Sequence, residues 1–193
     1  YERSFKYLYI IGLPISSGLY FLADKIIFFL YGKAYSGSII ALQIISWYLF
    51  IKFINFLLGI VLSSIDQQDK RMLGQGATAG FNVLLNLLLI PKFGYVGAAW
   101  STFATEVFLF IVYYLYVSKK LYYYDFGSIL LKPIIAVSIM SLFIKFSNFG
   151  LIITIFFSAL IYFASLLGLK TLDKEDSNIL RSIFKDETVQ KIA

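Results

Sequence analysis

The stretch NVLLNLLLIPKFGYVGAAWSTFATE, residues 82–106, combines features that a soluble core would not tolerate together. A strongly apolar run carries two asparagines, halts at Pro91, restarts at Gly97 and then encloses Glu106. Lipid provides no hydrophobic drive between helices, so tight packing relies on small residues and on interhelical hydrogen bonds. The stretch therefore predicts a packed helical hairpin in a membrane, in which Pro91 ends one helix and Gly94 allows a tight turn.

The composition of the whole chain is that of a membrane protein. Of the 193 residues, 60% are hydrophobic, 19% aromatic and only 15% charged, and the mean hydropathy is +0.80. These values lie well outside globular usage. The sequence has no cysteine and no histidine, which removes thiolate chemistry and the commonest metal ligand. We therefore expect no cofactor, and we do not expect an enzyme.

Apolar runs of about 20 residues, long enough to cross roughly 30 Å of hydrocarbon, recur six times along the chain. Their approximate limits are 6–30, 39–64, 72–91, 95–117, 127–146 and 150–169. Uninterrupted runs of this length favour helices over the alternating strands of a barrel. The predicted fold is an all-α polytopic membrane protein, with a six-helix transmembrane domain over residues 1–170.

The last segment, residues 171–193, changes character and mixes both charge signs. Four apolar residues cluster at helical spacing, namely Ile179, Leu180, Ile183 and Phe184. This pattern predicts a short amphipathic helix at the cytoplasmic headgroups. A partly ordered polar terminus is the alternative interpretation.

Lysine and arginine residues fall mainly in alternate loops. Eleven lie on one predicted side of the membrane, namely Arg3, Lys6, Lys70, Arg71, Lys119, Lys120, Lys170, Lys174, Arg181, Lys185 and Lys191. Only three, Lys33, Lys92 and Lys145, lie on the other side. The positive-inside rule then predicts that both termini of the chain are cytoplasmic, in a plasma membrane. Topology also explains most of the net charge of +6, so no nucleic-acid partner is expected.

The third predicted helix carries two kinds of packing signal. Gly76 and Gly80 form a G-x-x-x-G pair, which lets a neighbouring helix approach closely. Asn82 and Asn86, at i and i+4, project from one face, where an amide would otherwise be unpaired in hydrocarbon. Asn86 is also a candidate for a translocation path.

Two ionisable residues lie near the centres of predicted helices, Lys52 in 39–64 and Glu106 in 95–117. Such a group costs at least roughly 2.5 kcal/mol to insert, so it usually faces a bundle interior or a water-filled cavity and finds a partner. The functional interpretation is a transport path with Lys52, Asn55 and Glu106. The alternative is a structural pair of Lys52 with Glu106 or with Asn55. Lys25 is a weaker candidate, since it can snorkel to the outer interface.

Pro14, followed by Ser16, Ser17 and Gly18, interrupts the first apolar run. A proline inside a helix removes a backbone hydrogen bond and usually bends the helix. We therefore expect a kink at Pro14. Such kinks often mark helices that line a transporter site, although in many helices they have no functional role.

Four motifs together resemble a known family: Leu13-Pro14, YGKAY at 31–35, NxxxNLLLIPKFGYVGAAWST at 82–102 and LDKED at 172–176. They are similar to motifs in the C-terminal part of the polysaccharide flippases, or Wzx-type O-antigen transporters, of the multidrug/oligosaccharidyl-lipid/polysaccharide exporter superfamily. The resemblance implies a two-lobed helical bundle that moves polyprenyl-linked oligosaccharides across the lipid bilayer by alternating access.

The same resemblance implies partners and a site. This chain, which begins at Tyr1, would be a C-terminal fragment, and the N-terminal lobe of the same protein would be its partner. Glycan polymerase or ligase machinery would be further partners in cell-surface polysaccharide assembly. The family's cationic inner cavity, suited to the phosphate groups of the lipid carrier, implies that Lys52, and more weakly Lys25, contacts phosphate. Asn55 would bond nearby, while Glu106 would neutralise Lys52 or carry a coupling proton.

Other functions stay open at this stage. A cation-coupled drug or metabolite antiporter, or a peptidoglycan-precursor flippase, would belong to the same superfamily. A membrane enzyme acting on lipid-linked sugars would have to rely on Asp66 and Asp69, because two carboxylates three residues apart can share a divalent metal. Lys70 and Arg71 follow at once and favour a solvated loop instead.

Overall fold

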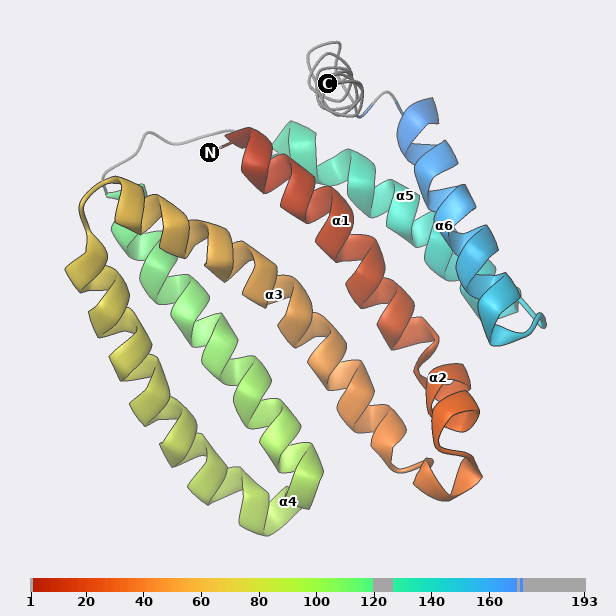
Figure 1. Ribbon diagram of the computed structural model, residues 1–193, viewed down its shortest axis with the longest axis horizontal. Helices are drawn as coiled ribbons and strands as arrows, with labels where there is room; N and C mark the ends of the chain where they lie inside the picture. The colour runs from red at the N-terminus through yellow and green to blue at the C-terminus, as the bar shows by residue number, and fades with distance from the viewer. Residues whose placement is uncertain (1, 120–126, 170, 172–193) are drawn as a thin grey trace, which may run out of the picture.

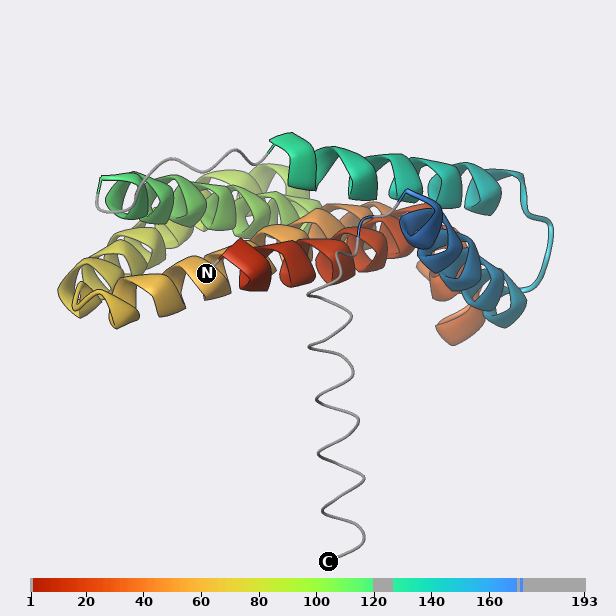
Figure 2. The ribbon, with the colours of Figure 1, turned by 90° about the horizontal axis from the view of Figure 1, so that it is seen from above.

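The computed structural model describes residues 2–119, 127–169 and 171, and within these ranges every regular element is helical. The elements are α1 (Glu2–Phe21), α2 (Ala23–Leu30), the 3-10 helix η1 (Lys33–Tyr35), α3 (Ser38–Ser64), α4 (Gln68–Ser118), α5 (Gly127–Phe146) and α6 (Leu151–Gly168). α1 and α3 form the centre of the bundle, α4 packs against α3, and α5 and α6 pack together with α5 against α1 (Figure 1). Seen from above, the helices form a shallow, elongated assembly (Figure 2).

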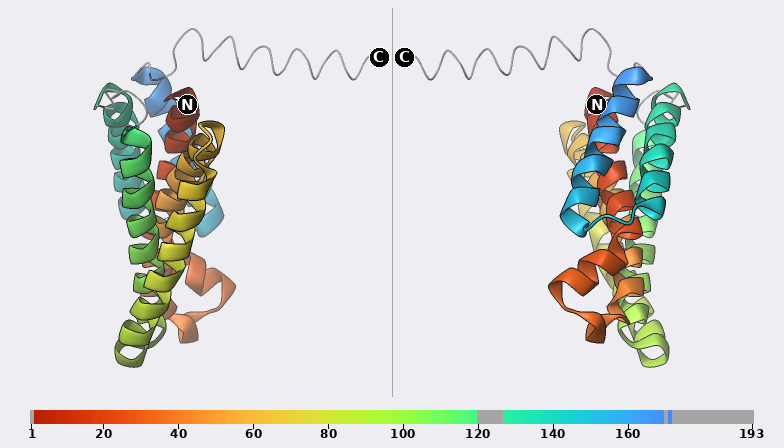
Figure 3. Two further views of the ribbon diagram at one scale, coloured as in Figure 1. Left: turned by 90° about the vertical axis from the view of Figure 1, so that its left-hand side faces the viewer. Right: turned by 90° about the vertical axis from the view of Figure 1, so that its right-hand side faces the viewer.

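α4 is a helical hairpin, which confirms the prediction from residues 82–106. Its two limbs run side by side from a sharp turn at one end of the molecule (Figures 1 and 3). The turn centres on Gly94, whose φ of 56° and ψ of −135° are not helical. A Cβ at Gly97 would lie 2.3 Å from the Leu89 carbonyl oxygen, so only glycine allows this approach. The prediction that Pro91 ends the helix was wrong by a few residues, because the helix continues through Pro91.

The predicted asparagine face joins the two limbs of α4. Asn82 Nδ2 donates to Thr105 Oγ1 at 3.0 Å, and Asn86 Nδ2 donates to Asn82 Oδ1 at 2.8 Å. Ser101 Oγ donates to Asn86 Oδ1 and so extends the network across the hairpin. Each amide thus has a partner where water is absent, which is the condition for placing asparagine in an apolar helix.

Within the described residues, the G-x-x-x-G pair does not pack against a neighbouring helix. A Cβ at Gly76 or Gly80 would meet no atom within 4 Å, and both residues are exposed. The buried small residues are Gly74 and Thr78, and a Cβ at Gly74 would lie 2.9 Å from a ring carbon of Tyr113. Gly74 and Thr78 lie on the same helix face as Asn82 and Asn86, because these four residues follow one another at i+4 spacing. Gly76 and Gly80 are each shifted by two residues, or about 200° around the helix, and so lie on the opposite face.

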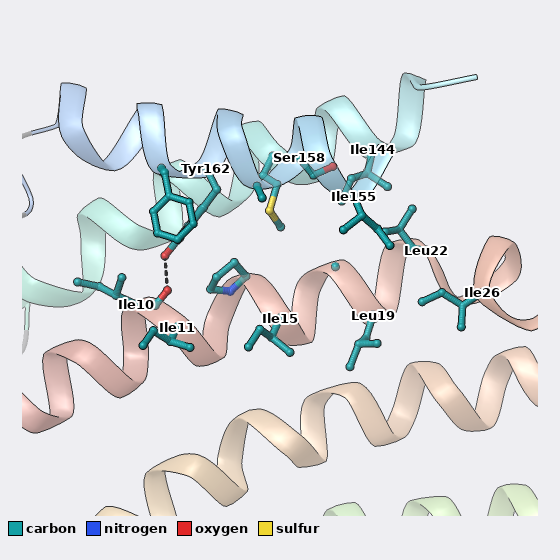
Figure 4. Close-up of a pocket in the computed structure, with 15 residues that line it drawn as sticks. Ile10, Ile11, Ile15, Leu19, Leu22, Ile26, Ile144, Ile155, Ser158 and Tyr162 are labelled. Atoms are coloured by element: carbon teal, nitrogen blue, oxygen red, sulfur yellow. Dashed lines mark hydrogen bonds between the residues drawn. The ribbon is translucent and has the colours of Figure 1, made fainter. Parts of the chain in front are cut away.

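The first apolar run, residues 6–30, is broken at Leu22 and is therefore not a single helix. α1 continues through Pro14, and α2 is bent by 67° from it. Pro14 cannot donate to the carbonyl of Ile10, and Tyr162 Oη donates to that oxygen at 2.7 Å instead (Figure 4). The α6 side chain therefore satisfies the carbonyl group that the proline leaves open.

Two apolar clusters hold the bundle together. The larger joins α1, α5 and α6 and consists of Tyr9, Ile10, Leu13, Leu22, Ala136, Val137, Met140, Ile144, Tyr162 and Leu166. The smaller joins α3 to the second limb of α4 through Leu58, Val61, Leu62, Tyr113 and Val117. A broad apolar surface remains exposed outside both clusters, as expected for helices surrounded by lipid.

By length and composition, three helices within the described residues are apolar enough to cross a membrane, namely α3, α4 and α6. The bent pair α1–α2 would be a fourth span. The six predicted transmembrane helices are not confirmed: they require that the two limbs of α4 are counted separately and that α5, which is not among these candidates, is also a span. The predicted tail, 171–193, lies outside the described residues except for Thr171.

Candidate functional site

A polar groove lies between α1, α3 and both limbs of α4. Its volume is about 580 Å³. Six polar side chains line it, Lys52, Asn55, Arg71, Gln75, Glu106 and Tyr113, and the remaining lining is apolar apart from Gly59. Sequence analysis nominated three of these residues, and the fold brings those three to one place although they come from two helices.

Asn55 and Glu106 form the buried end of the polar groove. Asn55 Nδ2 donates to the Glu106 backbone oxygen at 2.9 Å and to Glu106 Oε1 at 3.1 Å. Both side chains are buried, with 3% and 9% of their surface exposed. Asn55 Oδ1 is buried without a hydrogen-bond partner among the described residues, so the pair retains one unused acceptor.

Lys52 lies at the exposed side of the polar groove. Its Nζ donates to Tyr48 Oη at 2.7 Å and lies 5.1 Å from the centroid of the Tyr48 ring. Among the described residues no ion pair joins Lys52 to Glu106. Glu106 instead has the amide of Asn55 as its partner, so the structural pair of Lys52 with Glu106 is not formed. An ammonium group has three N–H donors, and Lys52 therefore keeps donors for a ligand.

Arg71 is a second cation in the polar groove, and sequence analysis missed it. The positive-inside argument placed Arg71 in a loop, but α4 begins at Gln68 and includes it. Arg71 Nη1 donates to Ser63 Oγ at 2.9 Å, and Nε passes 3.3 Å from where a Cβ on Gly59 would stand. The absence of a side chain at Gly59 thus makes room for the guanidinium group, and this glycine is the signal that could have revealed it.

Tyr113 and Gln75 complete the wall beside Arg71. Tyr113 is 2% exposed, and its hydroxyl donates to the Arg71 backbone oxygen at 3.3 Å. Because Tyr113 belongs to the second limb of α4 and Arg71 to the first, this bond fixes the first turn of the hairpin against its last turns. Gln75 lies one turn after Arg71 and adds an exposed amide.

Two other nominated residues lie outside the polar groove. Lys25 Nζ donates to the backbone oxygens of Ser147 at 2.9 Å and Phe149 at 3.1 Å, just after α5. Lys25 thus lies at the C-terminal end of α5, where the helix dipole favours a cation. This position agrees with the expectation that Lys25 extends to the membrane interface and does not line a transport path. Asn86 belongs to the hydrogen-bond network inside α4 and does not line the groove.

The pair Asp66 and Asp69 shows no sign of a metal site. Both carboxylates are exposed, and Asp66 occupies the turn between α3 and α4 with a φ of 54°. In the part of the chain that the structure describes, no group of three or more potential ligand residues lies close enough to hold a metal ion. The loop connects two helices, and we assign it no chemistry.

Comparison with known proteins supports the membrane assignment. The chain is 31% identical over 198 residues to an uncharacterized membrane protein of Methanocaldococcus jannaschii, and the match covers 95% of this chain and 38% of that protein. The chain therefore spans about two fifths of the length of this relative. No protein-family model matches the sequence, and no solved structure matches it significantly. Together with the apolar helices, the relative identifies an all-helical, multi-pass membrane protein.

Proposed function

We propose that the chain is the C-terminal part of a membrane flippase that translocates polyprenyl-linked oligosaccharide units for cell-surface polysaccharide assembly. The observation that supports this function best is the pair of cations, Lys52 and Arg71, in one polar groove between otherwise apolar helices. Lys52 lies next to the middle of α3, where a cation is expensive and usually marks a substrate or ion path, and Arg71 in the first turn of α4 adds a second charge to the same groove. A ligand that carries phosphate and arrives within the bilayer matches both the charge and the location.

The proposed mechanism assigns different tasks to the two cations. Arg71 offers a planar set of donors that can bind two phosphate oxygens at once. Lys52 acts as a point charge on a flexible stem and follows the phosphate as the groove changes shape. The saccharide and the polyprenyl chain extend away from this phosphate along the rest of the path, and alternating access moves the path between the two membrane faces.

Glu106 supplies the proposed coupling step. Its carboxylate accepts a hydrogen bond from Asn55 and forms no ion pair with Lys52 in the described part of the chain, which favours proton carriage over neutralisation of Lys52. Protonation would turn the carboxylate into a donor, and rotation of the Asn55 amide by half a turn would exchange Nδ2 for the unpaired acceptor Oδ1. The same buried carboxylate supports the second candidate, a cation-coupled drug or metabolite antiporter.

The proposed architecture has six transmembrane helices, forming one part of a two-lobed bundle whose other lobe comes from the same protein. Both termini of this chain would be cytoplasmic at the plasma membrane, and glycan polymerase or ligase machinery would receive the product. The start of α1, both ends of α4 and the end of α6 lie at the same end of the bundle (Figure 1), and basic residues occur at three of these helix ends, at positions 3, 70 and 119 of the sequence. This arrangement supports the topology that the positive-inside rule favours.

The direct test follows translocation of a lipid-linked oligosaccharide by the full-length protein in vesicles. We expect Lys52→Gln and Arg71→Gln each to slow translocation at least tenfold, equivalent to about 1.4 kcal/mol, because each removes a phosphate donor. Lys52→Arg keeps the charge and should retain most of the rate. Lys25→Gln is the matched control, since it removes a lysine outside the groove.

Unchanged translocation in both glutamine variants, at equal protein levels, would refute a phosphate site in the groove. Transport of a water-soluble cation against a proton gradient, without any lipid-linked substrate, would favour the antiporter. Faster movement of a peptidoglycan precursor than of other lipid-linked glycans would identify the nearby flippase class.

A further inference from the structure

Two pockets outside the polar groove differ in their hydrogen bonding. A pocket of about 360 Å³ between α1, α5 and α6 is almost wholly apolar (Figure 4). Its two principal hydroxyl groups already have partners, since Ser158 Oγ donates to the Thr154 oxygen at 2.6 Å and Tyr162 Oη donates to the Ile10 oxygen at 2.7 Å. This pocket offers no polar group to a ligand, so hydrocarbon fills it without loss.

The second pocket, here called the aromatic pocket, has a volume of about 280 Å³ and lies between α1, α3 and the second limb of α4. Its lining residues are Tyr20, Ile40, Gln43, Ile44, Trp47, Trp100 and Phe103. The chain contains only two tryptophans, and both line this pocket. The rings are not stacked on one another in a closed cluster, because Tyr20 and Trp47 are tilted with centroids 6.3 Å apart.

Four side chains of the aromatic pocket have polar groups without a partner. Among the described residues, no hydrogen bond engages the Tyr20 hydroxyl, the Gln43 amide, or the indole N–H of Trp47 or Trp100. None of these four groups is among the buried unpaired atoms of the described residues, so each is accessible from outside, and inside a membrane an unpaired donor costs free energy. Four side chains with such groups line one pocket, which favours a ligand that supplies hydrogen-bonding groups.

The usual explanation for membrane tryptophans does not cover Trp47. Tryptophan gathers at the headgroup level, at the ends of spans. Trp47 stands nine residues beyond Ser38, where α3 begins, or about 14 Å along a helix at 1.5 Å per residue. Trp47 also lies four residues before Ile51, the middle of the 27-residue α3, or about 6 Å along the helix, whereas the edge of a roughly 30 Å hydrocarbon core is about 15 Å from its centre. Trp100 is 50% exposed, so half of its surface is accessible to a ligand or to lipid.

We propose that the aromatic pocket binds a neutral sugar ring. A pyranose presents C–H groups on its faces and hydroxyl groups around its edge, so it needs apolar aromatic faces together with donors and acceptors. Trp47, Trp100 and Phe103 supply the faces, while Gln43 and Tyr20 supply edge contacts. This inference rests on the proposed function, since it assigns a place to the saccharide of the lipid-linked substrate.

The test measures saccharide binding separately from transport. The full-length protein in nanodiscs is titrated with a neutral disaccharide carrying a photoreactive diazirine, and cross-linked peptides are mapped. We expect cross-links within residues 40–47 and 100–103, and about tenfold weaker binding for Gln43→Leu and for Trp100→Leu. Trp100→Phe should lose less, because it keeps an aromatic face. Phe163→Leu, on the exposed surface of α6, is the matched control and should bind as the unaltered protein does.

The outcomes separate this site from the proposed function. Specific cross-linking and weakened binding without any flipping of a lipid-linked oligosaccharide would support the sugar site and refute the flippase. Normal flipping with no disaccharide cross-linking to the aromatic pocket, or with equal binding in every variant, would overturn the sugar site alone. Labelling of the same residues by a diazirine on a phospholipid acyl chain, undiminished by the disaccharide, would also overturn it.

Discussion

The two halves of the bundle are held together by different interactions. In the half formed by α3 and α4, polar side chains bond across the helices, as Asn55 does with Glu106 and Asn82 with Thr105. In the half formed by α1, α5 and α6, the large apolar cluster dominates, and the Tyr162 bond serves the backbone of α1. The first half contains the charged groove, whereas the pocket of the second has no charged lining.

This difference shows where a membrane protein can keep chemistry. Polar contacts between helices specify geometry in lipid, and they also leave donors and acceptors that a substrate can use, such as Asn55 Oδ1. Apolar packing specifies shape, and most of its few polar atoms bond within the protein, as Tyr162 Oη does, although Ser16 Oγ in α1 is buried without a partner among the described residues. The α3–α4 half is therefore suited to substrate contact and the α1–α5–α6 half to support.

The largest effect should come from breaking the polar half at its turn. Gly97→Leu places a Cβ against the Leu89 carbonyl group, and the limbs of α4 must separate, with a loss of more than about 3 kcal/mol of stability. Unfolding in sodium dodecyl sulfate would measure this loss of stability. Gly80→Leu is the matched control, since a side chain there meets open space. Equal stability of the two variants would contradict the hairpin packing.

An intermediate effect is expected from loss of the hydrogen bond between Tyr162 and the backbone oxygen of Ile10. Tyr162→Phe leaves the Ile10 carbonyl without a donor and should cost about 1.5 kcal/mol. Pro14→Ala restores a backbone N–H, so the same tyrosine change should cost less than about 0.5 kcal/mol in that background. The measurement is a double-mutant cycle by the same unfolding assay. Additive costs would show that Tyr162 stabilises α1 by packing only.

The smallest effect should come from one bond of the asparagine network. Asn86→Leu removes the contacts with Asn82 and Ser101 but adds apolar surface. Hydrogen bonds between membrane helices average about 0.6 kcal/mol, and we expect a loss of that order in the unfolding assay. Asn86→Gln tests geometry at constant polarity. A stabilised Asn86→Leu variant would mean that the network contributes specificity without stability.

The sequence predicted the hairpin because its signals are local. Asparagines at i and i+4, a proline and close glycines within one stretch leave few other arrangements in lipid. The packing role predicted for Gly76 and Gly80 is not seen, because the small size of a residue does not indicate which face of its helix meets a neighbour. The packed face of the first limb of α4 is the one that contains Gly74 and Thr78.

The site was predicted in part, and its missing members depend on tertiary contacts. Lys52 and Glu106 were recognisable alone because a central charge is expensive. Arg71 was not, because only the start of α4 at Gln68 and the small residue at Gly59 bring it into the groove. The aromatic pocket collects residues from three distant segments, and no local spacing reveals it.

The bond between Tyr162 and Ile10 also sets an order of events during biogenesis. The two residues are 152 positions apart. At a translation rate of about 5 to 20 residues per second, roughly 8 to 30 s pass between synthesis of the first and of the second. During that interval the Ile10 carbonyl needs a substitute donor, such as water in the translocation channel or a headgroup. Completion of the first helix thus waits for the last, and the nascent chain cannot settle fully into the bilayer until α6 has been inserted.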